Sequence, residues 1–455
     1  MTISPLPTSG AELSDLDRRH LIHPFQRGDI TDRIVMVRGS GAEVWDADGN
    51  EYLDATGGGN WHSHVGHGRR ELGEVAAAQM AELEYFTNFL EFSNEKAIRL
   101  ATRLASLAPE NINRIFFTSG GSEGVDTAFK AARLYHGRRG EPDRTWILAR
   151  HFAYHGATYG SGTATGFPPM HVGIGPNLPH VEKLMPPYVY RSEFFGGQDP
   201  TDFLVAELEA TIERIGAGNI AAMIGEPVMA GGGVLTPPAD YWPRVREVLT
   251  RNGILLIADE VVTAYGRLGA WFDSPGRGMQ PDMIVTAKGI ASGYAALGAT
   301  LFSDEVAELF AGGPGLFHGY TFSAHPVSCA IALENFAIME REGLHENALR
   351  IGEWFGEELA PARDLDTVGD VRVAGAMAAL EIVSDRDSRT AMGPLEVEQV
   401  AFAVRRNHGV IVRPYGNMLV VAPPLVFTRE QVRRASLALI DTVAQLRVDG
   451  QLAAA

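Results

Sequence analysis

Two apolar runs, GILLIADEVV at residues 253–262 and DMIVTAKG at residues 282–289, decide which fold the sequence specifies. Each run is short, rich in apolar residues and ends in polar side chains, as buried strands of a parallel sheet do. Three more runs have this form: NRIFFTSGG (113–121), TWILARHF (145–152) and AAMIGEPV (221–228). Stretches with apolar residues at helical spacing lie between the runs: VDTAFKAARLYHG (125–137), DFLVAELEATIERI (202–215) and ADYWPRVREVLTRNG (239–253). This alternation predicts βαβ units and a mostly parallel sheet over about residues 110–330.

The flanks of this region have a different pattern. Residues 30–55 alternate in a way that predicts antiparallel hairpins, and DADGNEYLD (46–54) supplies an Asp-Gly turn. The C-terminal part mixes the helical stretch CAIALENFAIMEREG (329–343) with short strands in RVAGAMAALEIV (372–383) and GVIVRPYGNMLVVAPPL (409–425). We therefore expect a large domain over residues 66–334 and a smaller α+β domain built from residues 1–65 and 335–455.

Composition favours a small-molecule ligand. The net charge of −17 argues against nucleic acid and anionic membrane as partners, since both require clustered Lys and Arg. No apolar run is long enough to span a bilayer. The N-terminal residues lack the pattern of a signal peptide, and Cys329 is the single cysteine. We expect a soluble, cytoplasmic protein without a structural disulfide.

Ligands of open α/β sheets collect at the carboxyl ends of the strands. The polar groups expected there are Ser119–Ser122, His151–Gly156, Glu226, Asp259 and Lys288. These residues are therefore the first candidates for a functional site.

Only four of the 39 Lys and Arg residues are lysines, so an amine nucleophile has few candidates. Lys96 and Lys130 lie in charged amphipathic stretches, where a solvated helix face is the simpler interpretation. Lys183 lies in a Pro-rich stretch with nothing nearby that is expected to lower its pKa. Lys288 instead leaves a buried strand into a segment of small residues that leaves room for a bulky ring. Burial and nearby positive charge would lower its pKa, which a Schiff-base lysine requires.

Asp259 ends the run GILLIA and places a carboxylate at the ligand edge of the sheet, where an unpaired charge is costly. A protonated pyridine nitrogen is a good cationic partner, because the pair keeps pyridoxal-5′-phosphate (PLP) an effective electron sink. A structural salt bridge with Arg267 is the alternative.

The stretch TSGGSEGVDTAFK (118–130) places Gly120, Gly121 and Ser122 where a strand turns into a helix. Free N–H groups and the helix dipole would form a phosphate cup there, although Ser122 could also be an ordinary N-cap. The stretch is neither a Walker loop nor a convincing G-x-G-x-x-G motif. Tyr154 and His155 follow another strand, where the aromatic ring could stack on a planar cofactor or pack in the core.

His62, His64 and His67 in WHSHVGHG have a spacing that could serve a metal ion. No cysteine or clear carboxylate ligand accompanies them, and the glycines indicate a loop with other duties. We therefore expect no metal.

Together these segments resemble the class III aminotransferases, PLP enzymes of fold type I. The resemblance covers most of the chain and rests on ordered motifs: HLIHPF (20–25), GSEGVDTAFKAAR (121–133), YHG (154–156), GEPV (225–228), ADEVVTAYGR (258–267), TAKGIASGY (286–294), GYTFSAHP (319–326) and VRPYGNMLVVAPPL (412–425). It implies an α/β fold with a large domain, whose mostly parallel central sheet is flanked by helices, and a smaller α+β domain built from both termini. It also implies PLP as the cofactor.

The family implies a role for each matching residue. Lys288 would be the Schiff-base lysine and proton shuttle, and Asp259 the partner of the pyridine nitrogen. The other implied cofactor contacts are Gly121 and Ser122 at the phosphate, Thr321 reaching there from the second subunit, Tyr154 and Val261 on the two ring faces, and Glu226 and His155 around Asp259 and the ring hydroxyl.

The amine–pyruvate and ω-amino acid branch of the family has a tryptophan near Trp61 and an arginine at Arg413. That arginine can bind a carboxylate bidentately or swing away for an uncharged amine. Phe25, Phe89 and Tyr154 are expected as apolar walls. We expect ping-pong transfer of an amino group from an amine or ω-amino acid to pyruvate or another 2-oxo acid.

The family also implies a homodimer with both active sites at the interface, possibly paired into a dimer of dimers. Racemases, aminomutases and decarboxylases of the same fold share nearly all these residues and stay open as alternatives. A non-catalytic PLP-binding regulator is a further alternative, against which the complete set of Lys288, Asp259 and Tyr154 argues.

Overall fold

The computed structural model describes residues 9–25, 33–311 and 314–452, and its centre is a seven-stranded sheet with the order β4-β10-β9-β8-β7-β5-β6. The strands are β4 (Ile112–Thr118), β5 (Trp146–Arg150), β6 (Val181–Leu184), β7 (Ile220–Gly225), β8 (Leu255–Asp259), β9 (Met283–Thr286) and β10 (Gly298–Ser303). The five strands from β9 to β6 are parallel, whereas β10 runs antiparallel to both β4 and β9. All five predicted strands are confirmed, and β6 and β10 were missed.

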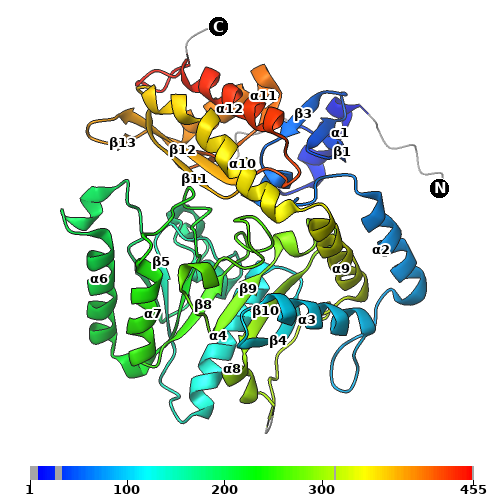
Figure 1. Ribbon diagram of the computed structural model, residues 1–455, viewed down its shortest axis with the longest axis vertical. Coiled ribbons are helices and arrows are strands. Elements are labelled where there is room, and N and C mark those ends of the chain that lie inside the picture. Colours follow the sequence, from blue (N-terminus) through cyan, green and yellow to red (C-terminus); the bar gives the residue numbers. More distant parts are fainter. Residues whose placement is uncertain (1–8, 26–32, 312–313, 453–455) are drawn as a thin grey trace.

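Helices cover both faces of this sheet (Figure 1). Ile257 and Val285 pack with residues of α4 (Gly121–Arg138), whereas the adjacent Leu256 and Ile284 pack with Trp242 of α7 (Tyr241–Arg251). Helix α6 (Pro200–Ile215) lies beside α7. Strands buried on both faces need apolar residues at every position, which explains the continuous apolar runs in the sequence.

Two smaller sheets are built from the ends of the chain. One has the order β1-β2-β3-β14 and contains β1 (Met36–Ser40), β2 (Glu43–Asp46), β3 (Glu51–Asp54) and β14 (Val410–Ile411). The other contains β11 (Val368–Ala374), β12 (Met377–Asp385), β16 (Met418–Val421) and β15 (Arg413–Tyr415), with β13 (Thr390–Ala391) beside β12. The hairpin predicted at residues 46–54 is confirmed, while residues 30–32 of the hairpin region lie outside the described residues. Because β14 pairs with β3, the two ends of the chain share a sheet (Figure 1).

The remaining α-helices are α1 (Gly10–His20), α2 (Arg70–Leu83), α3 (Glu95–Leu107), α5 (Tyr159–Ala164), α8 (Asp304–Glu308), α9 (Pro326–Arg341), α10 (Leu344–Glu358), α11 (Pro394–His408) and α12 (Arg429–Val443). Helix α9 continues across the expected boundary between residues 334 and 335, so the division into domains stays a prediction. In the described part of the chain, no helix is both long and apolar enough to cross a membrane.

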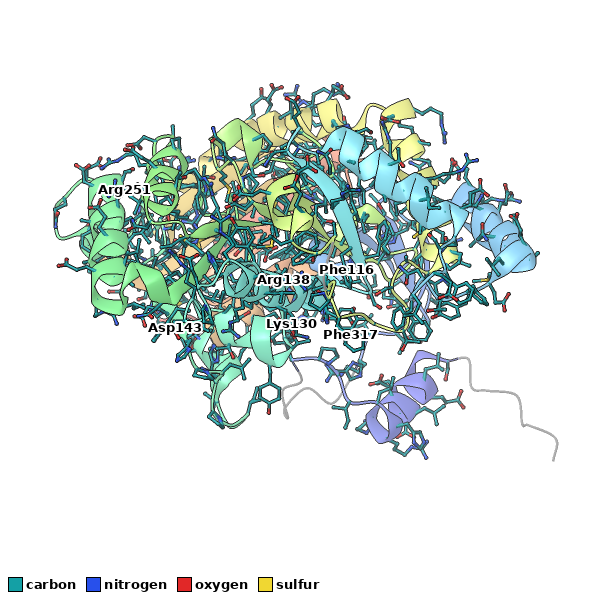
Figure 2. All side chains as sticks on the ribbon, turned by 90° about the horizontal axis from the view of Figure 1, so that it is seen from below. Phe116, Lys130, Arg138, Asp143, Arg251 and Phe317 are labelled. Carbon is teal, nitrogen blue, oxygen red and sulfur yellow. The ribbon has the colours of Figure 1, made fainter. Side chains whose placement is uncertain are left out.

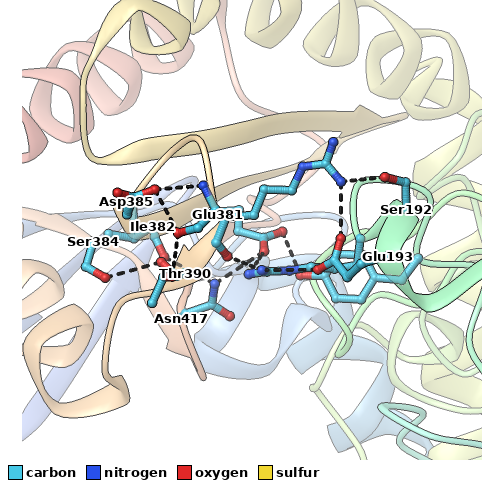
Figure 3. Close-up of polar contacts among 12 residues, drawn as sticks. Ser192, Glu193, Glu381, Ile382, Ser384, Asp385, Thr390 and Asn417 are labelled. Carbon is cyan, nitrogen blue, oxygen red and sulfur yellow. Dashed lines mark hydrogen bonds and ion pairs between the residues drawn. The ribbon is translucent and has the colours of Figure 1, made fainter. Parts of the chain in front are cut away.

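A buried ion-pair network ties the C-terminal sheet to the segment that follows β6. Glu381 on β12 is fully buried and accepts hydrogen bonds from Tyr188 (2.6 Å), Arg191 (2.6 Å), Arg372 (2.7 Å) and Asn417 (3.3 Å). Figure 3 shows Glu381 and Asn417 near Ser192 and Glu193, which begin the 3₁₀ helix η3 (Ser192–Phe195). Burial alone would raise the pKa of Glu381, but these partners hold it below its usual value. These hydrogen bonds and ion pairs therefore hold the charged carboxylate of Glu381 in the core.

Candidate active site

Lys288 begins a short 3₁₀ helix, η6 (Lys288–Ile290), just beyond β9. Its backbone is left-handed, with φ +48°, and its Nζ lies 5.6 Å from the centre of the Trp61 ring. Burial lowers the pKa of Lys288 to about 8, although the carboxylates of Asp259 and Glu226 act in the opposite direction. A measurable fraction of this amine is therefore neutral near physiological pH, as a nucleophile requires.

Asp259 ends β8 and is buried beside His155, whose Nδ1 lies 2.6 Å from Asp259 Oδ2. Asp259 Oδ1 accepts the N–H of Val261 at 3.1 Å. The alternative salt bridge with Arg267 is wrong, because the Arg267 guanidinium is directed away and donates to the carbonyls of Ala376 and Pro423. His155 and the backbone thus hold Asp259 in place, and its carboxylate can still bind a ligand.

Glu226 is buried and lies one residue after the end of β7. It accepts the N–H groups of Tyr154 and Ala230, both at 3.2 Å. Burial raises the pKa of Glu226 to about 7, with His155 acting against the rise and Asp259 adding to it. Glu226 therefore fixes the backbone of Tyr154 from beneath the site.

The start of α4 has the form of an anion site. The N-cap of the helix is Gly120, which provides no side-chain cap, so the alternative role of Ser122 as N-cap is wrong. Ser122 lies in the first turn instead, and its Oγ accepts the N–H of Ala157 at 3.1 Å. A Cβ on Gly121 would lie 2.9 Å from Val261 Cγ2, so the helix start and Val261 are in close contact. Uncapped N–H groups at a helix N-terminus bind phosphate.

An aromatic wall runs from Tyr154 through Phe167 and Tyr415 to Trp61. The ring centres are 6.4 Å apart for Tyr154 and Phe167, 4.8 Å for Phe167 and Tyr415, and 6.4 Å for Tyr415 and Trp61. Phe167 and Tyr415 were not among the residues predicted from the sequence. Tyr415 stands two residues after Arg413, and the period of two along a strand could have placed it on the same face.

Arg413 lies next to this wall on β15, and its Nη1 donates to the carbonyl of Gly59 at 2.5 Å. Gly59 belongs to the turn Gly57–Trp61, in which Asp54 accepts the N–H of Gly58 at 2.5 Å. Burial lowers the pKa of Arg413 from its ordinary value. The turn therefore holds both Trp61 and the arginine in place.

Three expected site residues lie at the surface of this chain. Phe25 is 65% exposed and Phe89 is 43% exposed. Thr321 is also exposed, and its carbonyl accepts the hydroxyl of Tyr85. The hydroxyl of Tyr320 donates to the carbonyl of Glu123 at 3.2 Å, which places the segment before Thr321 beside the first turn of α4.

Two of the three histidines considered as metal ligands have separate partners. His67 Nε2 lies 2.9 Å from Asp54 Oδ2, and His64 Nδ1 lies 2.9 Å from the Tyr265 carbonyl. Within residues 9–25, 33–311 and 314–452, no group of three His, Cys, Asp or Glu side chains could hold a metal ion.

Lys183 differs from its expected surroundings. It lies on β6, its Nζ is 3.2 Å from His171 Nε2, and burial lowers its pKa. The expectation that nothing lowers this pKa is therefore wrong, because the side chain is partly buried on β6.

These residues fit PLP. The start of α4 can hold a phosphate, Asp259 can face a ring nitrogen, and Lys288 offers an amine. His155 Nε2 is buried and has no hydrogen-bond partner among the described residues, as expected of a polar atom that awaits a bound group. Asp259 thus supplies an acidic contact, Lys288 a basic one and the N–H groups at the start of α4 neutral ones, all at one edge of the sheet.

Comparisons with known proteins agree with this geometry. The family model described as aminotransferase class-III matches residues 25–443. The putrescine–pyruvate aminotransferase of Pseudomonas aeruginosa is 35% identical over 429 residues, which are 92% of this chain and 93% of that protein. The taurine–pyruvate aminotransferase of Bilophila wadsworthia is 34% identical over 439 residues, with 93% and 94% covered.

Solved structures show the same similarity. A PLP-bound amine transaminase from an uncultivated Pseudomonas species superposes with a TM-score of 0.90 at 40% identity, covering 93% of this chain and 98% of that one. An (S)-enantioselective omega-transaminase from Thermomicrobium roseum superposes with a TM-score of 0.91 at 43% identity, covering 96% and 98%. The chain belongs to the class III aminotransferases and is a PLP-dependent aminotransferase of fold type I.

Proposed function

We propose that Lys288 and Asp259 carry the amino transfer, with PLP held between Tyr154 and Val261. Bound PLP supplies an electron-withdrawing ring that weakens a C–H bond beside the reacting nitrogen. The anchored carboxylate of Asp259 holds a proton on the pyridine nitrogen. His155 orients that carboxylate, since its Nδ1 lies 2.6 Å away.

The Lys288 amine moves the proton in this proposal. It takes a proton from the donor carbon at Nζ and returns one to the cofactor carbon, and the reverse order serves the acceptor. Its pKa of about 8 suits this exchange, because the amine must be neutral to accept a proton and charged to return it. The Trp61 ring, whose centre lies 5.6 Å from Nζ, would cover one side of the amine.

The remaining cofactor contacts follow from the same placement. Gly121 and Ser122 would hold the phosphate from this chain, and Thr321 of the partner subunit would complete the cup. Support comes from the uncapped start of α4 and from the exposure of Thr321 next to that helix.

The amino donor is an amine or ω-amino acid, and the acceptor is pyruvate or another 2-oxo acid. The observation that carries this proposal is the position of Arg413 beside the aromatic wall, with one N–H held by Gly59. Arg413 can leave that carbonyl to bind a carboxylate bidentately, or keep it while an uncharged amine occupies the wall. The relatives that use putrescine and taurine with pyruvate agree with this range.

A panel of amines and ω-amino acids, each assayed with pyruvate, tests the proposed function. We expect one alanine formed per donor consumed and parallel double-reciprocal lines, as ping-pong kinetics requires. PLP-loaded protein that makes no alanine with any donor would overturn pyruvate as the acceptor. Repeating the panel with 2-oxoglutarate in place of pyruvate then distinguishes a wrong acceptor from a wrong donor.

The active form is proposed to be a homodimer that pairs through an aromatic surface formed by Phe86, Phe89, Phe92, Phe317 and Phe322. These side chains are 43% to 102% exposed, and exposed apolar patches of this kind mark protein interfaces. Figure 2 shows Phe317 on the same side of the molecule as Phe116 and Lys130. Tyr85 packs against Phe322 with ring centres 5.8 Å apart, so the two segments form one surface.

Light scattering after size exclusion tests this interface. Phe317→Glu should convert the dimer to a monomer and weaken PLP binding, whereas Leu437→Glu, on the exposed side of α12, should leave the dimer intact. A dimer that survives Phe317→Glu unchanged would contradict the proposed surface. Pairing of dimers and the expected cytoplasmic location stay predictions.

A further inference from the structure

Arg413 and Tyr415 share one face of strand β15, because side chains two residues apart on a strand point the same way. The strand is held in register by β16, with Arg413 opposite Val420 and Tyr415 opposite Met418. Tyr415 is half-buried and packs edge-on against Phe167. Its hydroxyl is therefore directed along the same face as the guanidinium.

The groups around Tyr415 place its hydroxyl within the site. The charges that act on it come from Arg413, Tyr154 and Glu226, which lie on β15, after β5 and after β7. Burial, the largest effect, raises the pKa of Tyr415 far above its ordinary value, so the phenol keeps its proton at every working pH. In the described part of the chain, no hydrogen bond engages this hydroxyl. The Tyr415 hydroxyl is thus a neutral hydrogen-bond donor next to the positively charged Arg413.

Among the described residues, the neighbouring Arg413 has one hydrogen bond, from Nη1 to the carbonyl of Gly59. A carboxylate that meets Arg413 has two oxygens and about four lone-pair directions. A phenol on the same strand face can satisfy one of them without adding charge. Charge-assisted hydrogen bonds of this type are stronger than neutral ones.

We propose that Tyr415 is a specificity-determining residue that donates a hydrogen bond from its hydroxyl to the substrate carboxylate held by Arg413. The inference rests on the proposed function, because it assumes a carboxylate-bearing acceptor or donor. In this proposal Arg413 supplies the positive charge that attracts the carboxylate. Tyr415 supplies a hydrogen bond that selects a carboxylate, and its ring stays packed against Phe167 and Trp61.

Tyr415→Phe tests the inference, since it removes the hydroxyl and keeps the ring in the aromatic wall. Tyr159→Phe is the matched control, because Tyr159 is 65% exposed on α5. In the PLP-loaded enzyme, Tyr415→Phe should raise the KM for pyruvate and for β-alanine about tenfold, with a much smaller change in kcat. The KM for 1-phenylethylamine should rise by a clearly smaller factor. Isothermal titration calorimetry with propionate gives a readout without turnover, and its Kd should weaken by about the same tenfold.

Two outcomes would overturn the inference: an unchanged propionate Kd in Tyr415→Phe, or equal losses for pyruvate and 1-phenylethylamine. Failure of the proposed function has a different signature. The unmodified enzyme would then make no alanine from pyruvate, while propionate binding would still report on the hydroxyl.

Discussion

The charge state of Lys288 offers a sharp prediction. Burial lowers the pKa of this amine from 10.5 to about 8. At pH 7 an amine with a pKa of 8 is about 9% neutral, whereas one with a pKa of 10.5 is about 0.03% neutral. The surroundings of Lys288 therefore raise the concentration of the reactive form roughly 300-fold.

Trace acetylation of the protein freed of PLP measures this state directly. Because the chain has only four lysines, each falls in a peptide that mass spectrometry can quantify. The labelling rate of Lys288 should rise with pH and level off with a midpoint near 8. Lys130, exposed on α4, reports the general reactivity of the reagent.

Asp259→Asn perturbs the same midpoint in a known direction. Asp259 is the strongest of the groups that raise the pKa of Lys288, so its neutralisation should move the midpoint to lower pH. Arg413→Gln removes a positive charge that lowers this pKa and should move the midpoint upward. A rate that still climbs tenfold per pH unit above pH 9, or a shift of the opposite sign in Asp259→Asn, would refute the reasoning.

Three further predictions test the surrounding structure. Gly156→Ala should weaken PLP binding at least about tenfold in fluorescence titrations, because its Cβ would lie 2.6 Å from Ser122 Oγ and its φ is +134°. Gly137→Ala on α4, where a Cβ meets nothing within 4 Å, should bind PLP normally, and equal loss in both would contradict this. Burial raises the pKa of Glu226 from 4.5 to about 7, so the wild type loses stability relative to Glu226→Gln as pH rises from 4.5 through 7. Denaturant unfolding without PLP should show this difference growing by about 3 kcal/mol between pH 4.5 and 8, and a constant difference would exclude the raised pKa. Asp54→Asn should raise the KM for amines and lower the unfolding free energy by about 1–3 kcal/mol, because Asp54 holds the Gly57–Trp61 turn. An unchanged KM would show that this turn does not belong to the site.

Much of the central sheet could be predicted from the sequence, because strands buried on both faces leave short, continuous apolar runs. The strand of Leu255–Asp259 is an example. Strand β6 (Val181–Leu184) was missed because it lies at the sheet edge, where one side is exposed and Lys183 is tolerated. Strand β10 (Gly298–Ser303) was missed because its sequence GATLFS mixes small and polar residues with apolar ones and so gives no continuous apolar run, although every residue is buried within the sheet.

Residue patterns alone predicted the site where residues stand at strand ends, whereas Trp61 and Arg413 came from the resemblance to the family. Lys288 and Asp259 were found in this way. The pair of His155 and Asp259 joins residues 104 apart, so its geometry depends on the sheet order. Arg267 was assigned the wrong partner because nothing local shows that it turns toward the carbonyls of Ala376 and Pro423. Tyr415 was missed because its packing against Phe167 joins distant segments.

Borohydride reduction of the PLP-loaded enzyme tests the central claim most directly, because it fixes the cofactor to the amine that holds it. Peptide mass spectrometry should then find the phosphopyridoxyl mass on Lys288 alone, and Lys288→Ala should carry no label and form no alanine. A label on Lys183, Lys130 or Lys96, or turnover retained by Lys288→Ala, would contradict the assignment.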